Sequence, residues 1–335
     1  KVRVSQACLC DFAARQLSRC GMLALLRSFF AALVLWLMGA SVHADVRVLI
    51  VGSDGTSAYA EGAQALIGNL TQHGVARSDI RQMAVSEWNA ANGQVTALSP
   101  QAIIALGTEA SMTLARARLK SPVLSALIPR SSFERVLRES GRKVSAQFNV
   151  LYLDQPLQRQ LSLIRQALPE AKRVGVLLGP DSGPKSVVLR PIASTNGLVL
   201  KEGRIDANIS FFSTLQSVLE NSDVLLALAD PTVYNSNSIQ NILLSTIRYK
   251  VPMVAFSPAY VRAGAMLALY TTPMQAGAQS AQWALGVLDN RVLPELPMEP
   301  DDFEISFNEQ VARVLGLSLD IKALTLALKR QEQLP

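Results

Sequence analysis

Short apolar runs alternate with longer amphipathic segments through most of the chain after residue 45. In the first half, four runs rich in Val, Ile and Leu have the length of strands, and they span residues 46–51, 80–85, 102–106 and 123–128. Between them, apolar residues recur at helical spacing over 59–73 and 109–119. Almost continuous apolar strands separated by helices are typical of parallel sheets covered on both faces.

The same plan repeats in the second half. A helix over 157–168 precedes strand-like runs at 173–178, 198–202, 223–228 and 253–256, and the clearest further helices span 238–249 and 275–288. We therefore predict an α/β fold with two Rossmann-like lobes of parallel sheet joined by a hinge. Residues 144–154 are predicted to cross between the lobes, and 298–307 to return before helices near Glu309 and Ala323.

The first 44 residues have the pattern of a leader for export. Basic Arg27 precedes an apolar stretch over 29–38, and small residues follow up to Ala44. This order is that of a secretory signal peptide, here Met22–Ala44, and its apolar stretch is too short to span a bilayer. The alternative, a buried amphipathic helix of a cytosolic domain, requires a polar face that 29–38 lacks. We expect a periplasmic protein with an N-terminal lobe at 45–150, a C-terminal lobe at 151–300, and a return strand with C-terminal helices at 301–335.

Removing the leader changes the chemistry that is available. All three cysteines lie before Asp45, and His73 is the only histidine after it. Residues 45–335 carry 27 basic and 25 acidic residues without a basic run, which argues against nucleic acid as a partner. A Cys or His nucleophile and a His/Cys metal cluster are both excluded there. We expect a monomer that uses no cofactor and no metal.

Two motifs in residues 179–186 come close to known signatures and fail. The spacing is one residue short of a phosphate-binding loop, and Pro184 stands where a glycine is needed. Ser182 and Lys185 fit Ser-x-x-Lys, but the intervening Pro184 interrupts the helix that would bring the two side chains together. Neither motif supports an enzymatic function.

Loops that follow the strands hold the candidate ligand-binding residues, because ligands of open parallel sheets bind beyond the carboxyl ends of the strands. Each hydroxyl or carboxylate there either contacts a ligand or caps the next helix. An Asp could pair with a ligand ammonium, a Tyr could stack on a ring or pack in the core, and an Arg could clamp a carboxylate or stay solvated. The candidates are Ser53, Asp54, Thr108, Glu109, Ser111, Arg130, Asp181, Asp230, Thr232, Tyr234, Ser257 and Tyr270.

Several segments together resemble a known family. They are Asp154-Gln155-Pro156 with the helix that follows, 168–177, 250–257, 261–265, the helix start near Gln275, and 308–317. The chain is similar over nearly all of residues 45–335 to substrate-binding proteins of ABC transporters with the type I periplasmic fold, in the subfamily that includes tryptophan and tyrosine receptors.

The resemblance implies capture of a small polar ligand, such as an amino acid or a related organic molecule. Closure of the lobes and delivery to a membrane permease are implied as well, without chemistry by the receptor. Asp230 and Tyr270 match family positions, although Ala229 and Pro231 replace the usual neighbours of this Asp and the Tyr-Tyr-x-x-Gly segment is altered. Two alternatives stay open: a sensor of the same fold that signals to a membrane receptor or kinase, and an exported α/β enzyme.

Overall fold

The computed structural model describes residues 46–91, 99–117, 119–206, 210–293 and 297–333. The predicted signal peptide and the three cysteines lie outside these residues. In the part of the chain described, no helix combines the length and the apolar character needed to cross a membrane.

The first sheet contains five parallel strands in the order β2-β1-β3-β4-β5. They are β1 (Val48–Gly52), β2 (Ile80–Ala84), β3 (Ala102–Leu106), β4 (Val123–Ile128) and β5 (Phe148–Tyr152). Strand β1 pairs with both of its neighbours, so that Val48 lies beside Ile80 on one side and Ala102 on the other. The four strands predicted in this half are confirmed. The fifth forms within 144–154, where a crossing was predicted.

The second sheet contains six strands in the order β11-β10-β9-β8-β6-β7. They are β6 (Arg173–Leu178), β7 (Val199–Arg204), β8 (Val224–Leu226), β9 (Met253–Ala255), β10 (Leu267–Tyr270) and β11 (Glu304–Phe307). All pairs are parallel except β10 with β11, where Leu267 lies opposite Phe307. Two sheets dominated by parallel pairing confirm the predicted α/β class.

Helices cover both faces of each sheet, and most of them connect successive parallel strands. They are α2 (Ser57–Gln72), α3 (Val85–Ala90), α4 (Thr108–Arg116), α5 (Arg130–Ser140), α6 (Leu157–Ala167), α7 (Lys185–Thr195), α8 (Phe211–Glu220), α9 (Ile239–Arg248), α10 (Pro258–Ala263), α11 (Pro273–Leu288), α12 (Glu309–Val314) and α13 (Ile321–Gln333).

Side chains along a strand of the first sheet point alternately to its two faces, and each face packs in a hydrophobic core of its own. Val48 and Ile50 of β1 face the core that contains α2 and α11, whereas Leu49 and Val51 face the core under α3, α4 and α5. All four side chains are buried. Because both faces of the sheet are covered, the sequence of such a strand is an apolar run in which polar residues do not alternate with apolar ones.

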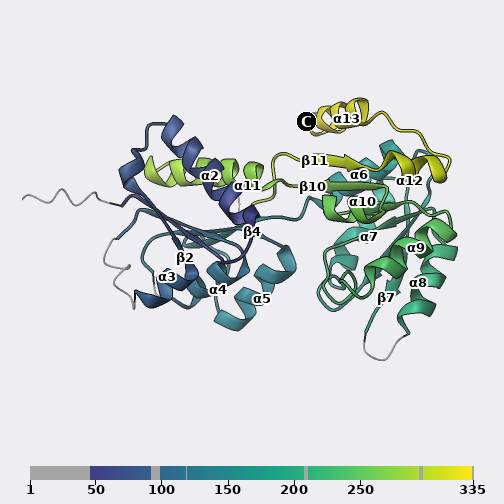
Figure 1. Ribbon diagram of the computed structural model, residues 1–335, viewed down its shortest axis with the longest axis horizontal. Coiled ribbons are helices and arrows are strands. Elements are labelled where there is room, and N and C mark those ends of the chain that lie inside the picture. The colour runs from purple at the N-terminus through teal and green to yellow at the C-terminus, as the bar shows by residue number, and fades with distance from the viewer. Residues whose placement is uncertain (1–45, 92–98, 118, 207–209, 294–296, 334–335) are drawn as a thin grey trace, which may run out of the picture. The chain divides into compact units, whose positions relative to one another are not determined.

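Helix α11 packs on the first sheet although its neighbours in sequence belong to the second. It lies against α2, as Figure 1 shows for the light green and purple helices, and it places Trp283 in the core with Leu66 and Leu70. The two helices approach so closely that a Cβ on Gly277 would lie 2.2 Å from the carbonyl oxygen of Gly62. The range 151–300 therefore does not correspond to one sheet, because tertiary packing rather than chain order decides where this helix lies.

We call the first sheet with α2–α5 and α11 the first lobe, and the second sheet with α6–α10, α12 and α13 the second lobe. Within the residues that the structure describes, the chain passes between them three times, at 153–156, 271–272 and 297–303, which we call the first, second and third crossings. Side chains tie these segments together: Thr271 Oγ1 donates to the Leu153 carbonyl at 3.0 Å, and Gln155 Nε2 donates to Thr271 Oγ1 at 2.8 Å. The sequence indicated the first and third crossings but not the second.

Candidate ligand-binding site

The predicted site residues lie at the carboxyl ends of strands, in the loops that follow them, or in the first turn of the next helix. In the first lobe these positions follow β1, β3 and β4, and in the second lobe they follow β6, β8, β9 and β10. The carboxyl ends of parallel strands meet at one edge of a sheet, so the topology gathers the residues of each lobe at one edge.

The loops after β1 and β3 are joined at this edge of the first lobe. Ser53 Oγ accepts a hydrogen bond from the Ala110 backbone N–H at 2.9 Å, and the Ser53 N–H donates to Leu106 at 2.8 Å. Gly107 has a φ of +91°, and a Cβ there would lie 2.6 Å from the Tyr59 ring. Tyr59 and Ser53 of the protein itself therefore occupy the space over Gly107.

The remaining candidates after β1 and β3 have different surroundings. Asp54 and Glu109 are exposed, and Thr108 is half-buried at the first position of α4. Burial raises the pKa of the Tyr59 phenol, and the nearby Glu109 carboxylate adds to the increase. Ser111 is fully buried and its hydroxyl donates to the Gly107 carbonyl at 2.7 Å, which gives it a local partner within α4.

Arg130 begins α5 and is held by three groups. Its backbone N–H donates to Asp154 Oδ2 at 2.6 Å, and its guanidinium lies 4.1 Å from the centre of the Tyr152 ring. The same guanidinium pairs with Glu299 at 2.8 Å. An arginine with an aromatic and a carboxylate partner is oriented rather than freely solvated. Burial raises the pKa of Tyr152, and Arg130 opposes that increase.

Asp154 and Lys185 form an ion pair that the sequence did not identify as part of the site. Lys185 Nζ lies 3.1 Å from Asp154 Oδ1, and the two side chains are only 10% (Lys185) and 12% (Asp154) exposed. Asp154 belongs to the first crossing and Lys185 is the first residue of α7, so the pair links a crossing to the second lobe. Asp154 ends the crossing that the sequence predicted at 144–154, and this was the available signal. Its partners lie 24 and 31 residues away in sequence, and nothing local indicated them.

Asp230 organises two loops of the second lobe. Its Oδ2 accepts hydrogen bonds from the Asp181 N–H at 3.1 Å and from the Ser182 N–H and hydroxyl at 2.8 Å each, while Oδ1 accepts from the Thr232 N–H at 2.9 Å. Asp230 is buried, with only 2% of its surface exposed. It does not cap the helix predicted over 238–249, because α9 begins at Ile239 and its N-cap is Ser238.

Three aromatic side chains form a cluster where β8 and β9 end. The ring centres of Tyr234 and Phe256 are 6.0 Å apart, those of Tyr234 and Tyr260 are 6.3 Å apart, and those of Phe256 and Tyr260 are 4.9 Å apart. Phe256 and Tyr260 are half-buried, whereas Tyr234 is buried and its hydroxyl has no hydrogen-bond partner among the described residues. Burial raises the pKa of Tyr234, and Tyr260 and Asp230 raise it further.

The other second-lobe candidates are placed as follows. Ser257 Oγ accepts from the Ala259 N–H at 3.3 Å and caps α10, so the capping role predicted for it as one alternative is present. Thr232 is exposed and Asp181 is half-buried. Tyr270 is half-buried at the end of β10, where burial and the Glu304 carboxylate raise its pKa and Arg262 lowers it.

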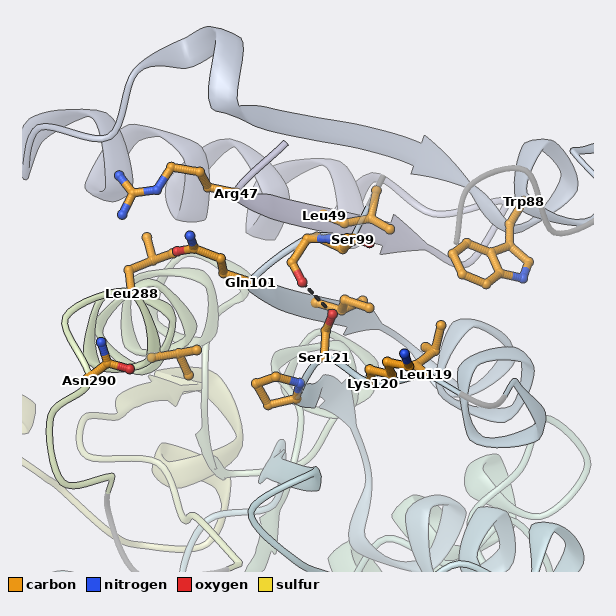
Figure 2. A pocket seen from close by; sticks show the side chains of 14 residues that line it. Arg47, Leu49, Trp88, Ser99, Gln101, Leu119, Lys120, Ser121, Leu288 and Asn290 are labelled. Atoms are coloured by element: carbon orange, nitrogen blue, oxygen red, sulfur yellow. Dashed lines mark hydrogen bonds between the residues drawn. The ribbon is translucent and has the colours of Figure 1, made fainter. Parts of the chain in front are cut away.

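A large cavity lies at the opposite edge of the first sheet, where the strands begin. Its volume is about 930 Å³, and Figure 2 shows Arg47, Gln101 and Asn290 around it, with Trp88 further along. None of the predicted site residues is among those that line it. Within the described ranges, no group of three or more His, Cys, Asp and Glu side chains is arranged to hold a metal ion.

Two α/β lobes, three crossings and polar loops at the carboxyl ends of both sheets define the class of two-lobed binding proteins. Residues 53–330 match the family described as ABC transporter substrate binding protein. The match covers most of the chain. The chain belongs to this family, and the resemblance seen in the sequence is confirmed. Among curated proteins, no sequence matches significantly.

Solved structures share the fold at low sequence identity. A domain from Streptococcus pneumonia in complex with L-Trp is 17% identical with a TM-score of 0.54, covering 83% of this chain and 97% of that one. A ligand-free, open substrate-binding protein with adhesive properties from Clostridium difficile is 18% identical with a TM-score of 0.65, over 82% and 96%. A conserved domain protein from Vibrio cholerae is 20% identical with a TM-score of 0.55, over 84% and 98%.

Proposed function

We propose that the protein is an exported solute receptor that binds a small polar ligand between its lobes and delivers it to the permease of an ABC transporter. The observation that carries this proposal is the family match over residues 53–330, which includes every strand of both sheets except β1, and all three crossings. Chain crossings between two lobes provide a hinge, and closure round a ligand is the motion that such a hinge allows. The receptor itself performs no chemistry.

The ligand site that we propose combines the polar loops of the first lobe with the aromatic cluster of the second. Ser53, Thr108 and Glu109 offer hydroxyl and carboxylate groups. Phe256 and Tyr260 offer partly exposed ring faces, which suit a flat apolar group or an organic cation. An amino acid or a related molecule that carries a ring matches this combination.

Asp230 is the weaker candidate for direct contact with a ligand ammonium. Four donors of the protein already occupy its two oxygens, so a ligand would have to share or displace them. We therefore propose that Asp230 shapes the site through the loops that it joins, and that Glu109 or Asp181 supplies a carboxylate for a cationic group if the ligand carries one.

Mass spectrometry of small molecules released from protein purified without refolding would identify the ligand. A thermal-shift series with single amino acids, L-tryptophan and L-tyrosine included, should then show stabilisation of about 2.7 kcal/mol at a hundredfold excess over Kd. Phe256→Ala should abolish this shift, and Phe212→Ala is the matched control because Phe212 is 61% exposed on α8. Absence of any released molecule, together with no stabilisation by any amino acid, would reject an amino-acid ligand.

Export and the partner require separate measurements. N-terminal sequencing of protein from the periplasmic fraction should begin near Asp45, and cross-linking in the presence of the identified ligand should capture a membrane permease. Capture of a membrane kinase in place of a permease would contradict delivery to a transporter, and would favour a sensor.

A further inference from the structure

The first lobe holds the third crossing through backbone and side-chain hydrogen bonds. Met298 extends the edge of β5, because its carbonyl accepts from the Tyr152 N–H at 3.1 Å and its N–H donates to Val150 at 2.9 Å. Gln279 of α11 donates to the Glu299 carbonyl at 2.9 Å and accepts from the Asp301 N–H at 3.1 Å. The start of the crossing is thus attached to the first lobe.

Arg159 makes most of the bonds by which the second lobe holds the same crossing. Arg159 of α6 donates from Nη1 to the Pro300 carbonyl at 2.9 Å, and from Nη2 toward the Asp301 carbonyl at 3.4 Å. Gln155 adds a bond to the Asp302 carbonyl at 3.1 Å and accepts from Arg159 Nη1 at 2.6 Å. Arg159 is only 8% exposed, which is unusual for an arginine unless it is paired.

The C-terminal helix supplies the pairing. Glu332 of α13 accepts from Arg159 Nε and, at 3.0 Å, from Nη2, so that it binds the guanidinium with both oxygens. Lys329, one turn earlier, pairs with Asp302 of the crossing at 2.8 Å. The guanidinium also lies 5.1 Å from the centre of the Phe303 ring, which is buried. In Figure 1, α13 lies beside β11, the strand that follows this crossing.

Packing alone does not hold the crossing. A cavity of about 800 Å³ borders it, with Arg159, Asp301, Asp302 and Glu332 in its wall. A segment that borders open space on one side holds its conformation mainly through its hydrogen bonds. The forked guanidinium can hold two neighbouring carbonyls and a carboxylate at once, which a lysine ammonium cannot reproduce in the same geometry.

We propose that Arg159, oriented by Glu332, is a positioning residue for lobe movement. It fixes residues 300–302 to the second lobe, while Met298 and Gln279 fix residues 298, 299 and 301 to the first, so that the attachments of the two lobes meet at residues 299–301 and bending is confined there. This inference rests on the proposed function, because it concerns the hinge by which a ligand would be enclosed. It needs no ligand for its test.

The test compares Arg159→Gln and Glu332→Gln with Arg173→Gln in ligand-free protein. Arg173 is the matched control because it pairs with Asp223 in the same lobe, away from the crossings. Amide hydrogen exchange across 297–303 should accelerate about tenfold in Arg159→Gln and less in Glu332→Gln, and small-angle scattering should show a broader distribution of distances in both. Arg159→Lys should unfold at the thermal midpoint of the wild type but keep the fast amide exchange of Arg159→Gln across 297–303.

Three results would overturn the proposal. They are unchanged exchange over 297–303, an equal acceleration across every strand of the second lobe, and local acceleration with scattering identical to that of Arg173→Gln. If Arg159→Gln does not fold, Glu332→Gln, which leaves the arginine in place, decides between these outcomes. Failure of the receptor proposal would show in the ligand experiments and would leave these measurements unaffected.

Discussion

Asp230 and Ser182 are joined by two hydrogen bonds, since a single carboxylate oxygen accepts from both the backbone N–H and the hydroxyl of Ser182 at 2.8 Å. The bonds connect the loop after β8 with the loop after β6, across 48 positions of sequence. The carboxylate also prevents any side chain at position 179, because a Cβ on Gly179 would lie 2.7 Å from it. The two loops therefore depend on one buried group.

We expect Asp230→Asn to lower the free energy of unfolding by about 2 kcal/mol, because an amide nitrogen would face N–H and O–H donors in a buried site. Chemical denaturation measures the change. Asp181→Asn is the control and should stay within about 0.5 kcal/mol. An Asp230→Asn protein that unfolds like the wild type but no longer responds to its ligand would show that the carboxylate serves the ligand instead.

Much of the fold could be predicted because buried parallel strands have a strong pattern. The runs at 102–106, 123–128 and 173–178 coincide with β3, β4 and β6. The strands that were not predicted are short: β5 has five residues at a sheet edge, within the predicted crossing at 144–154, and β10 has four, whereas β11 falls within the return strand predicted for 301–335. A short strand at an edge has no periodicity long enough to recognise.

Long-range packing was not available from the sequence. The periodicity of 275–288 predicted a helix, but nothing in it indicated α2 as the partner rather than the second sheet. The ion pair of Lys185 with Asp154 was equally hidden, because it requires two distant segments to meet. The contacts of Phe256 were hidden too, because its position at the end of a predicted strand gave no sign of them. Loop candidates such as Ser257 could be placed at a helix start, whereas the choice between cap and ligand contact needed the hydrogen bonds.

The contact between α2 and α11 makes Gly277 sensitive to substitution. Gly277→Ala would place a Cβ 2.2 Å from the Gly62 carbonyl oxygen, so the helices must separate, and we expect a loss of about 2–3 kcal/mol. Gly68→Ala in α2 is the control, because a Cβ there meets no described atom within 4 Å and a helix interior favours alanine by about 0.5–1 kcal/mol. Equal stability of the two variants would contradict the close packing.

Asp223 gives the second lobe an acid-dependent contribution to stability. The Arg173 guanidinium and the Lys172 and Arg173 N–H groups lower the pKa of this carboxyl from its ordinary 3.8 to about 2. A lowered pKa means that the contribution is complete above the ordinary value and is lost as pH falls from about 4 through about 2. Denaturation series should show Asp223→Asn less stable than wild type at pH 7 and nearly equal at pH 2.

The control for that series is Glu170→Gln, since Glu170 is exposed in the same lobe. It should follow the wild type at every pH. If the free energies of unfolding of wild type and Asp223→Asn differed by the same amount from pH 7 to pH 2, the contact between Asp223 and Arg173 would stabilise the lobe through packing and not through charge.

The hydroxyl of Tyr234 is a buried polar group without a hydrogen-bond partner in the part of the chain that the structure describes, although its ring packs against Phe256 and Tyr260. Leaving a hydroxyl unpaired away from water costs about 1–3 kcal/mol, so Tyr234→Phe, which keeps the ring, should raise the free energy of unfolding by about 1 kcal/mol. Denaturation of ligand-free protein measures this. Tyr260→Phe is the comparison, because Tyr260 Oη donates to the Tyr234 carbonyl over a long 3.4 Å and its loss should change little. If Tyr234→Phe instead loses about 1 kcal/mol or more, the hydroxyl has a partner in solution, and repeating the comparison with the identified ligand would show whether that partner is the ligand.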